Sequence, residues 1–466
     1  MKAVITKVSI DGNPVSFTGV NLVQEINKHH HFNIIIDLEA AEAIDAYEPT
    51  SSKAWIGKNI SISFDSQTFY GVVTSVALKR SGGSNGSIHI SGFSSTYKLE
   101  NGAHLRSWCD KGLATIVNDA IGSSGVTADV KPEYTSTPSY ECQYMESNFQ
   151  FIRRLAKQYG EWLYYDGEKL KFGKPGSLPT PIKLIYGYDL QQLDLNMNIT
   201  ARPSKGFSYN AAGNDNLDSS SPNSSGGLGD LGQTAFNATM SLFPEGAVHF
   251  IAPRVGNRFE LGEVLKKEQQ AQASQSYVVS GSSYNSNVKI GGVVDLRTSL
   301  IGGGIDPVPV EKNLGLYFIT SIVHQAGEGD SYENSFEGIP SSVPSLPAPD
   351  AEYPIAQTQS AVVVDNKDPK NQGRVRVKMN WQGSEKTQWL RVMTPNAGKS
   401  DKVPKNRGLV FVPEVDDIVL VGFRHDNPNR PFVLGSLFNG TTASGGSDNN
   451  KTKSITTRSG STITFD

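Results

Sequence analysis

Residues 144–160, with the sequence YMESNFQFIRRLAKQYG, are the most informative stretch of this chain for its fold. Ser147 and Gln150 stand three residues apart, which is the spacing of a capping box that starts a helix. Gly160 stands where a left-handed C-terminal cap belongs. The apolar side chains between these positions recur every three or four residues and therefore share one helix face: Phe149, Ile152, Leu155, Ala156 and Tyr159. The stretch predicts an amphipathic helix that ends at Gly160.

A β-hairpin is predicted directly after this helix. Residues 162–165 and 169–172 are two apolar runs, and Asp166-Gly167 between them is a strong turn signal. A weaker helix is expected at 112–121 and a third at 259–276. Upstream, short segments between residues 60 and 91 alternate polar and apolar side chains around Gly/Ser/Asn turns, which favours an antiparallel sheet or barrel.

The C-terminal half of the sequence predicts further β structure. Residues 214–232 are polar and glycine-rich and predict an exposed loop, whereas the proline-rich residues 340–349 predict an extended spacer. About five short strands follow between residues 361 and 435, including 389–393 and 408–413, which is typical of a small closed barrel such as an OB fold. Ile455 and Ile463 lie in a final strand pair that cannot bury its apolar face alone, so repeated rungs or neighbouring subunits would have to cover it.

Length and composition agree with a turn-rich β protein of about three domains. The chain has 466 residues, of which 46 are glycine and 19% are charged, and this composition disfavours helical bundles, coiled coils and disorder. The formal net charge is -3, whereas a protein that neutralises phosphates normally carries a basic excess. Cys109 and Cys142 are too few for a disulfide framework and are expected to be buried free thiols.

No targeting or membrane segment is expected from the sequence. The N-terminus lacks a signal-peptide pattern, and no apolar stretch approaches the roughly 20 residues that span a bilayer. We therefore expect synthesis in the cytoplasm without a conventional export signal. If the protein acts outside the cell, another machine must carry it there.

Motifs with possible chemistry are present but weak. Residues 227–232 match GxGxxG, yet a loop-like segment precedes them, so a flexible loop is favoured over a dinucleotide site. His29, His30 and His31 could offer two metal ligands, although a solvated turn is the better interpretation because neighbours on a strand point to opposite faces. His324 ends an apolar strand and is expected to be a satisfied core or rim residue rather than a base.

A nucleic-acid face on the C-terminal barrel is also disfavoured. Its basic residues alternate with valines, as expected for an ordinary strand with one face in the core. The residues in question are Arg374, Arg376, Lys378 and Arg391, near Trp381 and Trp389. No catalytic residue, cofactor site or metal site is expected, and no HExxH, Walker or EF-hand pattern is present.

Several motifs resemble the VgrG spike proteins. Residues 144–160 are similar to the hub-domain signature of that family. Residues 373–378 (GRVRVK), 389–392 (WLRV), 413–421 (PEVDDIVLV) and 426–440 resemble its barrel domain, and 457–466 resemble the start of its needle. The residues that carry the resemblance have structural roles: Ser147, Phe149, Ile152, Leu155, Gly160, Gly373, Arg374, Val375, Trp389, Arg391, Val392, Pro413, Pro428, Pro431, Gly435 and Gly460. Asp416 departs from the family, which usually has glycine there, but aspartate tolerates turn geometry.

The resemblance implies a mainly β homotrimer with helical insertions. A hub would occupy residues 1–340, with β-barrels at 1–100 and 180–340 joined by 101–179. A proline-rich linker at 341–355, an OB-fold barrel at 356–440, and a linker with the start of a triple-stranded β-helix needle at 441–466 would follow. The sequence ends where that β-helix is expected to begin.

The role implied by the resemblance is that of a hub and spike in a type VI secretion machine. Its partners would be an Hcp-like tube ring, baseplate proteins, and a PAAR-like tip protein or an effector, with no nucleic acid and no integral membrane segment. The protein would assemble in the bacterial cytoplasm and be delivered outward or into a target cell. A phage tail or an extracellular contractile particle is an alternative machine. A cell-wall-degrading enzyme is disfavoured, because residues 440–450 leave no room for the lysozyme domain of phage relatives.

Overall fold

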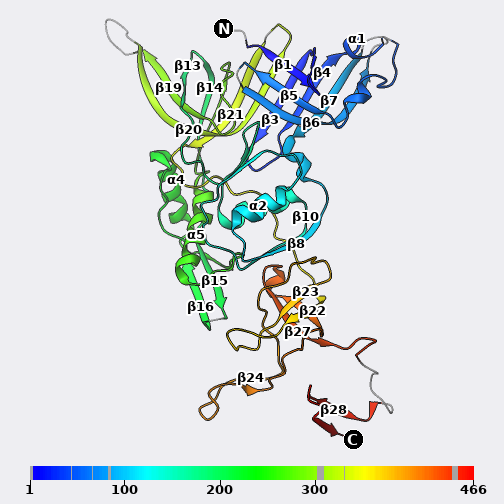
Figure 1. The fold of residues 1–466 in the computed structure, drawn as a ribbon. Helices are drawn as coiled ribbons and strands as arrows, with labels where there is room; N and C mark the ends of the chain where they lie inside the picture. Colours follow the sequence, from blue (N-terminus) through cyan, green and yellow to red (C-terminus); the bar gives the residue numbers. More distant parts are fainter. Residues whose placement is uncertain are drawn as a thin grey trace. The chain divides into compact units, whose positions relative to one another are not determined.

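The computed structural model describes residues 4–43, 45–65, 67–81, 86–211, 213–301, 309–329, 331–442 and 450–465. The chain divides into two compact units. The first unit consists of Met1–His104, Gly112–Thr137 and Glu146–Tyr353, and the second of Leu105–Lys111, Pro138–Met145 and Pro354–Asp466. Strands predominate in both units, and the α-helices of the described residues all belong to the first (Figure 1).

The first unit is built on one continuous sheet of thirteen strands. Their bounds are β1 (Thr6–Ile10), β2 (Asn13–Val15), β3 (Gly19–Glu25), β4 (His31–Asp37), β5 (Asn59–Phe64), β6 (Gln67–Arg80), β7 (Gly86–Ser94), β13 (Ile182–Tyr186), β14 (Leu190–Met197), β18 (Tyr277–Ser283), β19 (Val293–Ile301), β20 (Pro309–Gly327) and β21 (Tyr332–Pro340). The order is β19-β13-β14-β18-β21-β20-β3-β4-β7-β6-β5-β1-β2. Because β19 also pairs with β20, the six strands from β19 to β20 form a closed ring.

The two halves of this sheet meet where β3 pairs with β20. The pairing is antiparallel and places Val23 opposite Val323. Alternation of apolar and polar side chains decides which face of each strand is buried, as β4 illustrates: Phe32, Ile34 and Ile36 are buried, and the residues between them are not. The alternation predicted between residues 60 and 91 corresponds to strands β5, β6 and β7.

The predicted helix and hairpin around residues 144–172 are confirmed. Helix α3 (Asn148–Tyr159) follows Ser147, whose hydroxyl accepts a hydrogen bond from the Gln150 N–H at 3.1 Å, while the Gln150 side chain accepts from the Ser147 N–H at 2.9 Å. Gly160 ends the helix with φ 64°. The hairpin strands are β11 (Leu163–Tyr165) and β12 (Leu170–Phe172), and β9 (Ala128–Val130) pairs parallel to β12.

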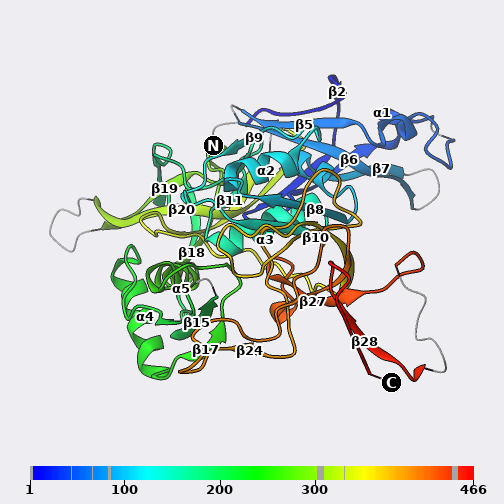
Figure 2. The same cartoon turned by 60° about the horizontal axis from the view of Figure 1, so that its bottom comes forward.

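The other helices are α1 (Leu38–Ala41), α2 (Leu113–Ile121), α4 (Gly229–Leu242) and α5 (Arg258–Ala273). Helices α2 and α5 match the predictions at 112–121 and 259–276. Helix α5 packs against a small sheet of β15 (Ser204–Asn210), β16 (Asp215–Ser220) and β17 (Ala247–Phe250). Figure 2 shows α4 and α5 side by side next to this sheet.

The loop predicted at 214–232 is wrong over much of its length. Strand β16 begins at Asp215, and α4 begins at Gly229. Both were missed because five of the six residues of β16 are polar and α4 has no side-chain cap at its start. Packing stabilises them instead: Leu217 is buried under α5, and Phe236 of α4 is buried in the main core.

The proline-rich segment, expected to act as a spacer, packs on the first unit as far as Tyr353. Val343 and Leu346 are buried in its main core. The Trp162 indole N–H donates to the Pro344 carbonyl at 3.3 Å, and the Asn27 amide donates to the Pro347 carbonyl at 2.8 Å. Because an extended backbone has no internal hydrogen bonds, its carbonyl groups can accept hydrogen bonds from neighbouring side chains such as Trp162 and Asn27. The segment can therefore cover a core.

The second unit contains a four-stranded sheet in the order β23-β22-β26-β27. The bounds are β22 (Gln359–Asp365), β23 (Arg376–Met379), β26 (Ile418–Phe423) and β27 (Pro431–Leu437). Most residues of the pair β8 (His104–Cys109) and β10 (Tyr140–Glu146) also belong to this unit, and shorter pairs are β24 (Ala397–Gly398) with β25 (Arg407–Gly408) and β28 (Lys453–Thr456) with β29 (Thr462–Phe465). Its core is rich in valine.

Two segments that were expected to be strands, residues 389–393 and 408–413, do not form regular strand pairings. In residues 389–393 the structure has isolated bridges from Leu390 to Val375 and from Val392 to Val433. Residues 409–413 form no strand, and Leu409, Val410 and Phe411 are exposed in this chain. A continuous apolar run was therefore mistaken for a regular strand, although the Leu409 N–H still donates to the Asn396 carbonyl at 3.0 Å and Val412 packs against the valine-rich core.

Candidate functional site

The hub signature residues on α3 hold the helix in the core of the first unit. Phe149, Ile152 and Leu155 are buried, and the Phe149 ring stacks on His29 with centroids 3.8 Å apart. A Cβ added at Gly160 would lie 2.7 Å from a carbon of the Lys267 side chain, in a left-handed conformation that already favours glycine.

A buried ion pair on the same helix was missed by sequence reasoning. The Arg154 guanidinium donates to both oxygens of Glu146, from Nε at 2.7 Å and from Nη2 at 2.9 Å, and Nη1 donates to Gln158 at 3.1 Å. Arg154 is almost completely buried. The only sequence signal for this ion pair was the eight-residue spacing of Glu146, at the end of a strand, and Arg154, within the following helix.

The first barrel signature closes a turn around one carboxylate. Arg374 donates to Asp368 through Nε at 2.9 Å and Nη2 at 2.6 Å, and backbone N–H groups of residues 370, 372 and 374 donate to the same carboxylate. The Arg374 guanidinium, together with these backbone donors, holds the pKa of Asp368 well below its usual range. Gly373 supplies the positive φ of 67° that the turn requires. Arg374 is thus committed within the barrel and not presented as part of a basic face.

The other barrel signatures are also structural. Val375 and Leu390 exchange backbone hydrogen bonds at 3.0 and 2.7 Å, and the Arg376 guanidinium lies over the Trp389 ring at 5.5 Å. Residues 391–393 pair with Val433: the Val433 N–H donates to the Arg391 carbonyl at 2.9 Å, the Met393 N–H donates to the Val433 carbonyl at 2.8 Å, and Val392 forms a β-bridge with Val433. The Asn366 side-chain amide donates to the Pro413 carbonyl at 3.2 Å. Asp416 has φ 76°, a conformation in which glycine is otherwise favoured.

Two prolines flank a residue that anchors β10 to the barrel. Pro428 and Pro431 are buried, and between them the Asn429 side chain accepts from the Cys142 N–H at 2.8 Å and donates to Glu141 at 2.9 Å. Sequence reasoning missed this anchor because its partners lie 287 and 288 residues away. Gly435 lies within β27, and Gly460, with φ 85°, forms the turn between β28 and β29.

The histidine tract is not the solvated turn that was expected. His30 is buried just before β4, and His29 contacts Glu100 at 3.1 Å and Thr96 at 2.8 Å. Only His31, the first residue of β4, is exposed. Cross-strand packing explains the difference, since the alternating pattern of β4 continues one residue before the strand.

His324 is a satisfied core residue, as expected. Gln24 joins it to His30: the Gln24 amide donates to His30 Nδ1 at 3.0 Å, and its carbonyl oxygen accepts from His324 Nε2 at 3.1 Å. The Tyr332 hydroxyl donates to His324 Nδ1 at 2.6 Å. Burial lowers the pKa of both histidines to about 3. This cluster lies at the seam of β3 and β20 and is stabilising rather than reactive.

The cysteines and the glycine-rich motif offer no reactive site. Both cysteines are free; Cys142 is buried and Cys109 half-buried, and burial raises the pKa of the Cys109 thiol to about 11. In the GxGxxG motif, a Cβ at Gly227 would lie 2.1 Å from the Ser342 carbonyl oxygen, so this glycine permits close packing on the proline-rich segment. Helix α4 begins at Gly229, but residues 221–228 before it form no strand, and a dinucleotide site requires one. Among the described residues no group of three His, Cys, Asp or Glu side chains could hold a metal ion.

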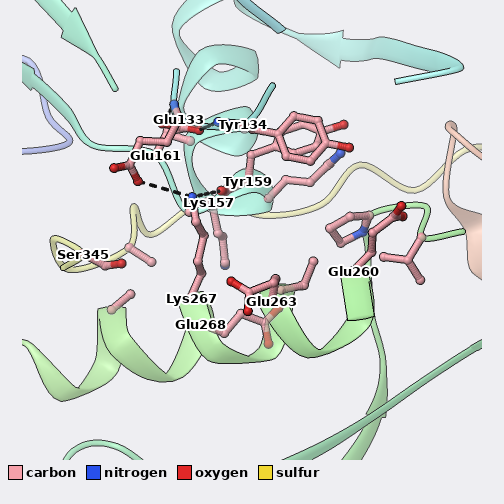
Figure 3. Close-up of a pocket in the computed structure, with 18 of the residues that line it drawn as sticks. Glu133, Tyr134, Lys157, Tyr159, Glu161, Glu260, Glu263, Lys267, Glu268 and Ser345 are labelled. Carbon is pink, nitrogen blue, oxygen red and sulfur yellow. Dashed lines mark hydrogen bonds and ion pairs between the residues drawn. The ribbon is translucent and has the colours of Figure 1, made fainter. Parts of the chain in front are cut away.

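The first unit also has a surface pocket of about 400 Å³. It lies between the end of α3, residues 133–136, α5 and the proline-rich segment (Figure 3). Its lining mixes apolar and aromatic side chains with five glutamates. Within the described part of the chain, no helix is long and apolar enough to cross a membrane.

Comparison with known families agrees with this architecture. Residues 33–180 match the phage tail baseplate hub (GPD) family, and residues 359–438 match the type VI secretion system/phage-baseplate injector OB domain. The spike proteins VgrG1c and VgrG1b of Pseudomonas aeruginosa are 30% and 31% identical to the chain over 123 residues. Each match covers 24% of this chain and 16% of the relative, so the chain spans about a sixth of the length of these relatives.

Solved structures resemble nearly the whole chain. The Escherichia coli c3393 protein, a type VI secretion component similar to the T4 tail proteins gp27 and gp5, has a TM-score of 0.60 at 16% identity, covering 92% of this chain and 99% of that one. The VgrG complex with PdpA from Francisella has a TM-score of 0.57 at 10% identity, covering 98% and 74%. A tail protein of Neisseria meningitidis has a TM-score of 0.54 at 12% identity, covering 74% and 99%. The hub match, the OB match and the spike-protein relatives together support a VgrG-like protein, similar to the hub and spike proteins of type VI secretion systems and phage baseplates.

Proposed function

We propose that this chain forms the trimeric hub and spike of a contractile injection machine, with a structural rather than a catalytic role. The observation that carries the proposal is the hairpin of β28 and β29. Ile455 pairs with Ile463, and Phe465 lies on the same face; these side chains are 42%, 59% and 59% exposed. An isolated two-stranded hairpin is only marginally stable in water, so neighbouring copies have to cover this face.

A second exposed apolar surface supports contacts between copies. Met393, Leu409, Val410 and Phe411 are all exposed beside the β24–β25 pair. Several large exposed apolar side chains in neighbouring segments are a feature of interaction sites. In the trimer, these segments would contact adjacent subunits, and the hairpin would begin the shared needle.

Light scattering on the purified chain tests the trimer. We expect a mass three times the chain mass of 50.4 kDa. Ile463→Asp places a charge on the apolar hairpin face and should shift the population toward monomer, whereas Thr464→Asp, on the opposite face, should not. A monomer that retains an ordered hairpin at micromolar concentration contradicts the proposal.

The partners and the machine follow from the same class of protein. A VgrG relative forms a complex with PdpA, which supports a tip or effector partner for this chain, and the hub match supports contact with a tube ring and a baseplate. Delivery out of the cell should require the sheath, so deletion of a sheath gene of the host's type VI system should abolish export.

A phage-tail hub is the second candidate, favoured by the tail proteins among the structural relatives. Export that persists in the sheath deletion, together with recovery of the chain in phage-like particles, would select this machine. A cell-wall-degrading role predicts lysis of peptidoglycan in zymography, which we do not expect from this chain.

A further inference from the structure

The pocket next to α5 combines an apolar wall with unevenly distributed charge. Five glutamates line it, against Lys157, Arg254 and Lys267. The apolar wall consists of small and aliphatic side chains: Ala156, Val264, Ala271 and Leu346. A cavity of about 400 Å³ with such a wall can accept one long side chain with its aliphatic stem.

The two lysines of the pocket are committed to other groups. Lys267 donates to the Tyr159 carbonyl at 3.3 Å and lies 3.6 Å from Glu133. Lys157 donates to the Ala351 carbonyl at 2.7 Å and lies over the Tyr353 ring. Neither lysine forms an ion pair with the carboxylates of α5.

Those carboxylates are Glu263 and Glu268, which rise from α5 on the side of the pocket opposite Tyr134 and Tyr159 (Figure 3). Glu263 forms an exposed pair with Lys266 one helical turn away, a kind of pair that contributes little and exchanges readily. Glu268 faces His249 at 3.5 Å, and burial raises its pKa despite the nearby His249 and Lys157 charges. The lining as a whole carries five carboxylates against three basic side chains, so an added cation would reduce its net negative charge.

Aromatic rings complete the site. The centroids of the Tyr134 and Tyr159 rings lie 4.4 Å apart. The faces of aromatic rings attract ammonium and guanidinium groups. At the same pocket Phe259 is 76% exposed. A free small cation would leave that ring in water, whereas neighbouring apolar residues of a polypeptide could cover it.

We propose that this pocket is a docking site for a partner protein segment, which inserts a lysine or arginine side chain between the α5 carboxylates and the Tyr134–Tyr159 pair. An apolar neighbour of that basic residue covers Phe259. The argument rests on charge complementarity within the first unit and is independent of the trimer, so the two proposals can fail separately.

Fluorescence anisotropy on the full chain tests the site with a labelled peptide of sequence GSLRLSG. A matched peptide carries citrulline in place of arginine, which keeps the shape and removes the charge. We expect the arginine peptide to bind with Kd at or below about 1 mM and the citrulline peptide to bind about tenfold more weakly. Glu268→Gln should weaken the arginine peptide about tenfold, and the matched control Glu328→Gln, an exposed glutamate outside the pocket, less than about twofold.

Thermal melts of both variants verify that they fold. Equal binding of the two peptides would show an apolar groove without charge recognition and overturn the proposal. Equal effects of Glu268→Gln and Glu328→Gln would place binding elsewhere, and absence of binding at several millimolar would exclude the site. Spermidine that saturates the pocket at lower concentration than the peptide would make it a small-amine site rather than a docking site, which also overturns the proposal.

Discussion

Two buried histidines joined through Gln24, His30 before β4 and His324 in β20, make the stability of the first unit depend on pH. Burial holds the pKa of His30 and of His324 at about 3, whereas a histidine in the unfolded chain has a pKa near 6.5. Well above pH 6.5 both residues are neutral in both states. As the pH falls below 6.5 the unfolded chain binds protons that the native protein cannot bind, so acid destabilises the fold.

The magnitude follows from linkage. Each histidine removes about 1.4 kcal/mol of stability per pH unit once the pH is well below 6.5. At pH 5 the loss is about 2 kcal/mol for each histidine and about 4 kcal/mol for the pair, because the native pKa values lie far below 5. Glu42, with a pKa lowered to about 2 by its Ser52 and Thr50 hydrogen bonds despite burial, contributes only below about pH 4.5.

Urea unfolding between pH 5 and 7.5, followed by tryptophan fluorescence, measures this dependence. His324→Gln keeps a donor for Gln24 and an acceptor for the Tyr332 hydroxyl but cannot titrate. At the acid end of this range it should reduce the change in unfolding free energy by about 1.4 kcal/mol per pH unit. His31→Gln, the same substitution at the exposed first residue of β4, is the matched control and should leave the slope unchanged. The comparison removes contributions common to all variants, including those of Glu161 and Glu268, whose raised pKa values act in the opposite direction.

Two results would refute the reasoning. One is a pH slope in His324→Gln equal to that of the unsubstituted chain. The other is an NMR titration in which both buried imidazoles take up protons near pH 6.5, because the native and unfolded states would then bind protons equally.

Three substitutions test the structural anchors. Arg154→Met strands the buried Glu146 carboxylate and should lower the free energy of unfolding by about 3–5 kcal/mol, with partial recovery when Glu146→Gln is added; an effect under about 1 kcal/mol in urea unfolding would contradict the buried pair. Arg374→Lys loses the bidentate hydrogen bonds to Asp368 and should lower the free energy of unfolding of the second unit by about 1–2 kcal/mol. An unchanged urea midpoint would show that the bidentate contact is dispensable. Gly160→Ala forces a Cβ into a left-handed turn and should cost about 1–2 kcal/mol by thermal melting, whereas an unchanged melting temperature would contradict the need for glycine at this cap.

Local signals in the sequence predicted local structure well. The Ser147–Gln150 box, the Gly160 cap and the Asp166-Gly167 turn act over a few residues, so helix α3 and the hairpin after it followed directly. Elements stabilised by distant contacts did not follow. Helix α4 has no capping side chain and is stabilised by burial of Phe236, a contact that no local pattern encodes.

The same distinction holds for the sites. The signature residues around Gly373 were recognisable, but the carboxylate of Asp368 that Arg374 binds was not, since aspartates near turns usually bind only the backbone. His30 was misjudged because the strand pairing that buries it is non-local. The pocket beside α5 gathers residues from four separate segments, and its composition could not be assembled from sequence spacing.

The division of the chain has a consequence for anyone who exchanges modules between such proteins. The polypeptide passes between the two units five times, at residues 104–105, 111–112, 137–138, 145–146 and 353–354. The second unit contains β10, to which Asn429 is anchored through Cys142, and residue 107, whose hydroxyl accepts from Gln382 at 2.6 Å. A C-terminal fragment cut at residue 354 would lack both partners and expose the groups that bind them. Transplanting this barrel into another scaffold therefore demands two internal grafts in addition to a terminal fusion.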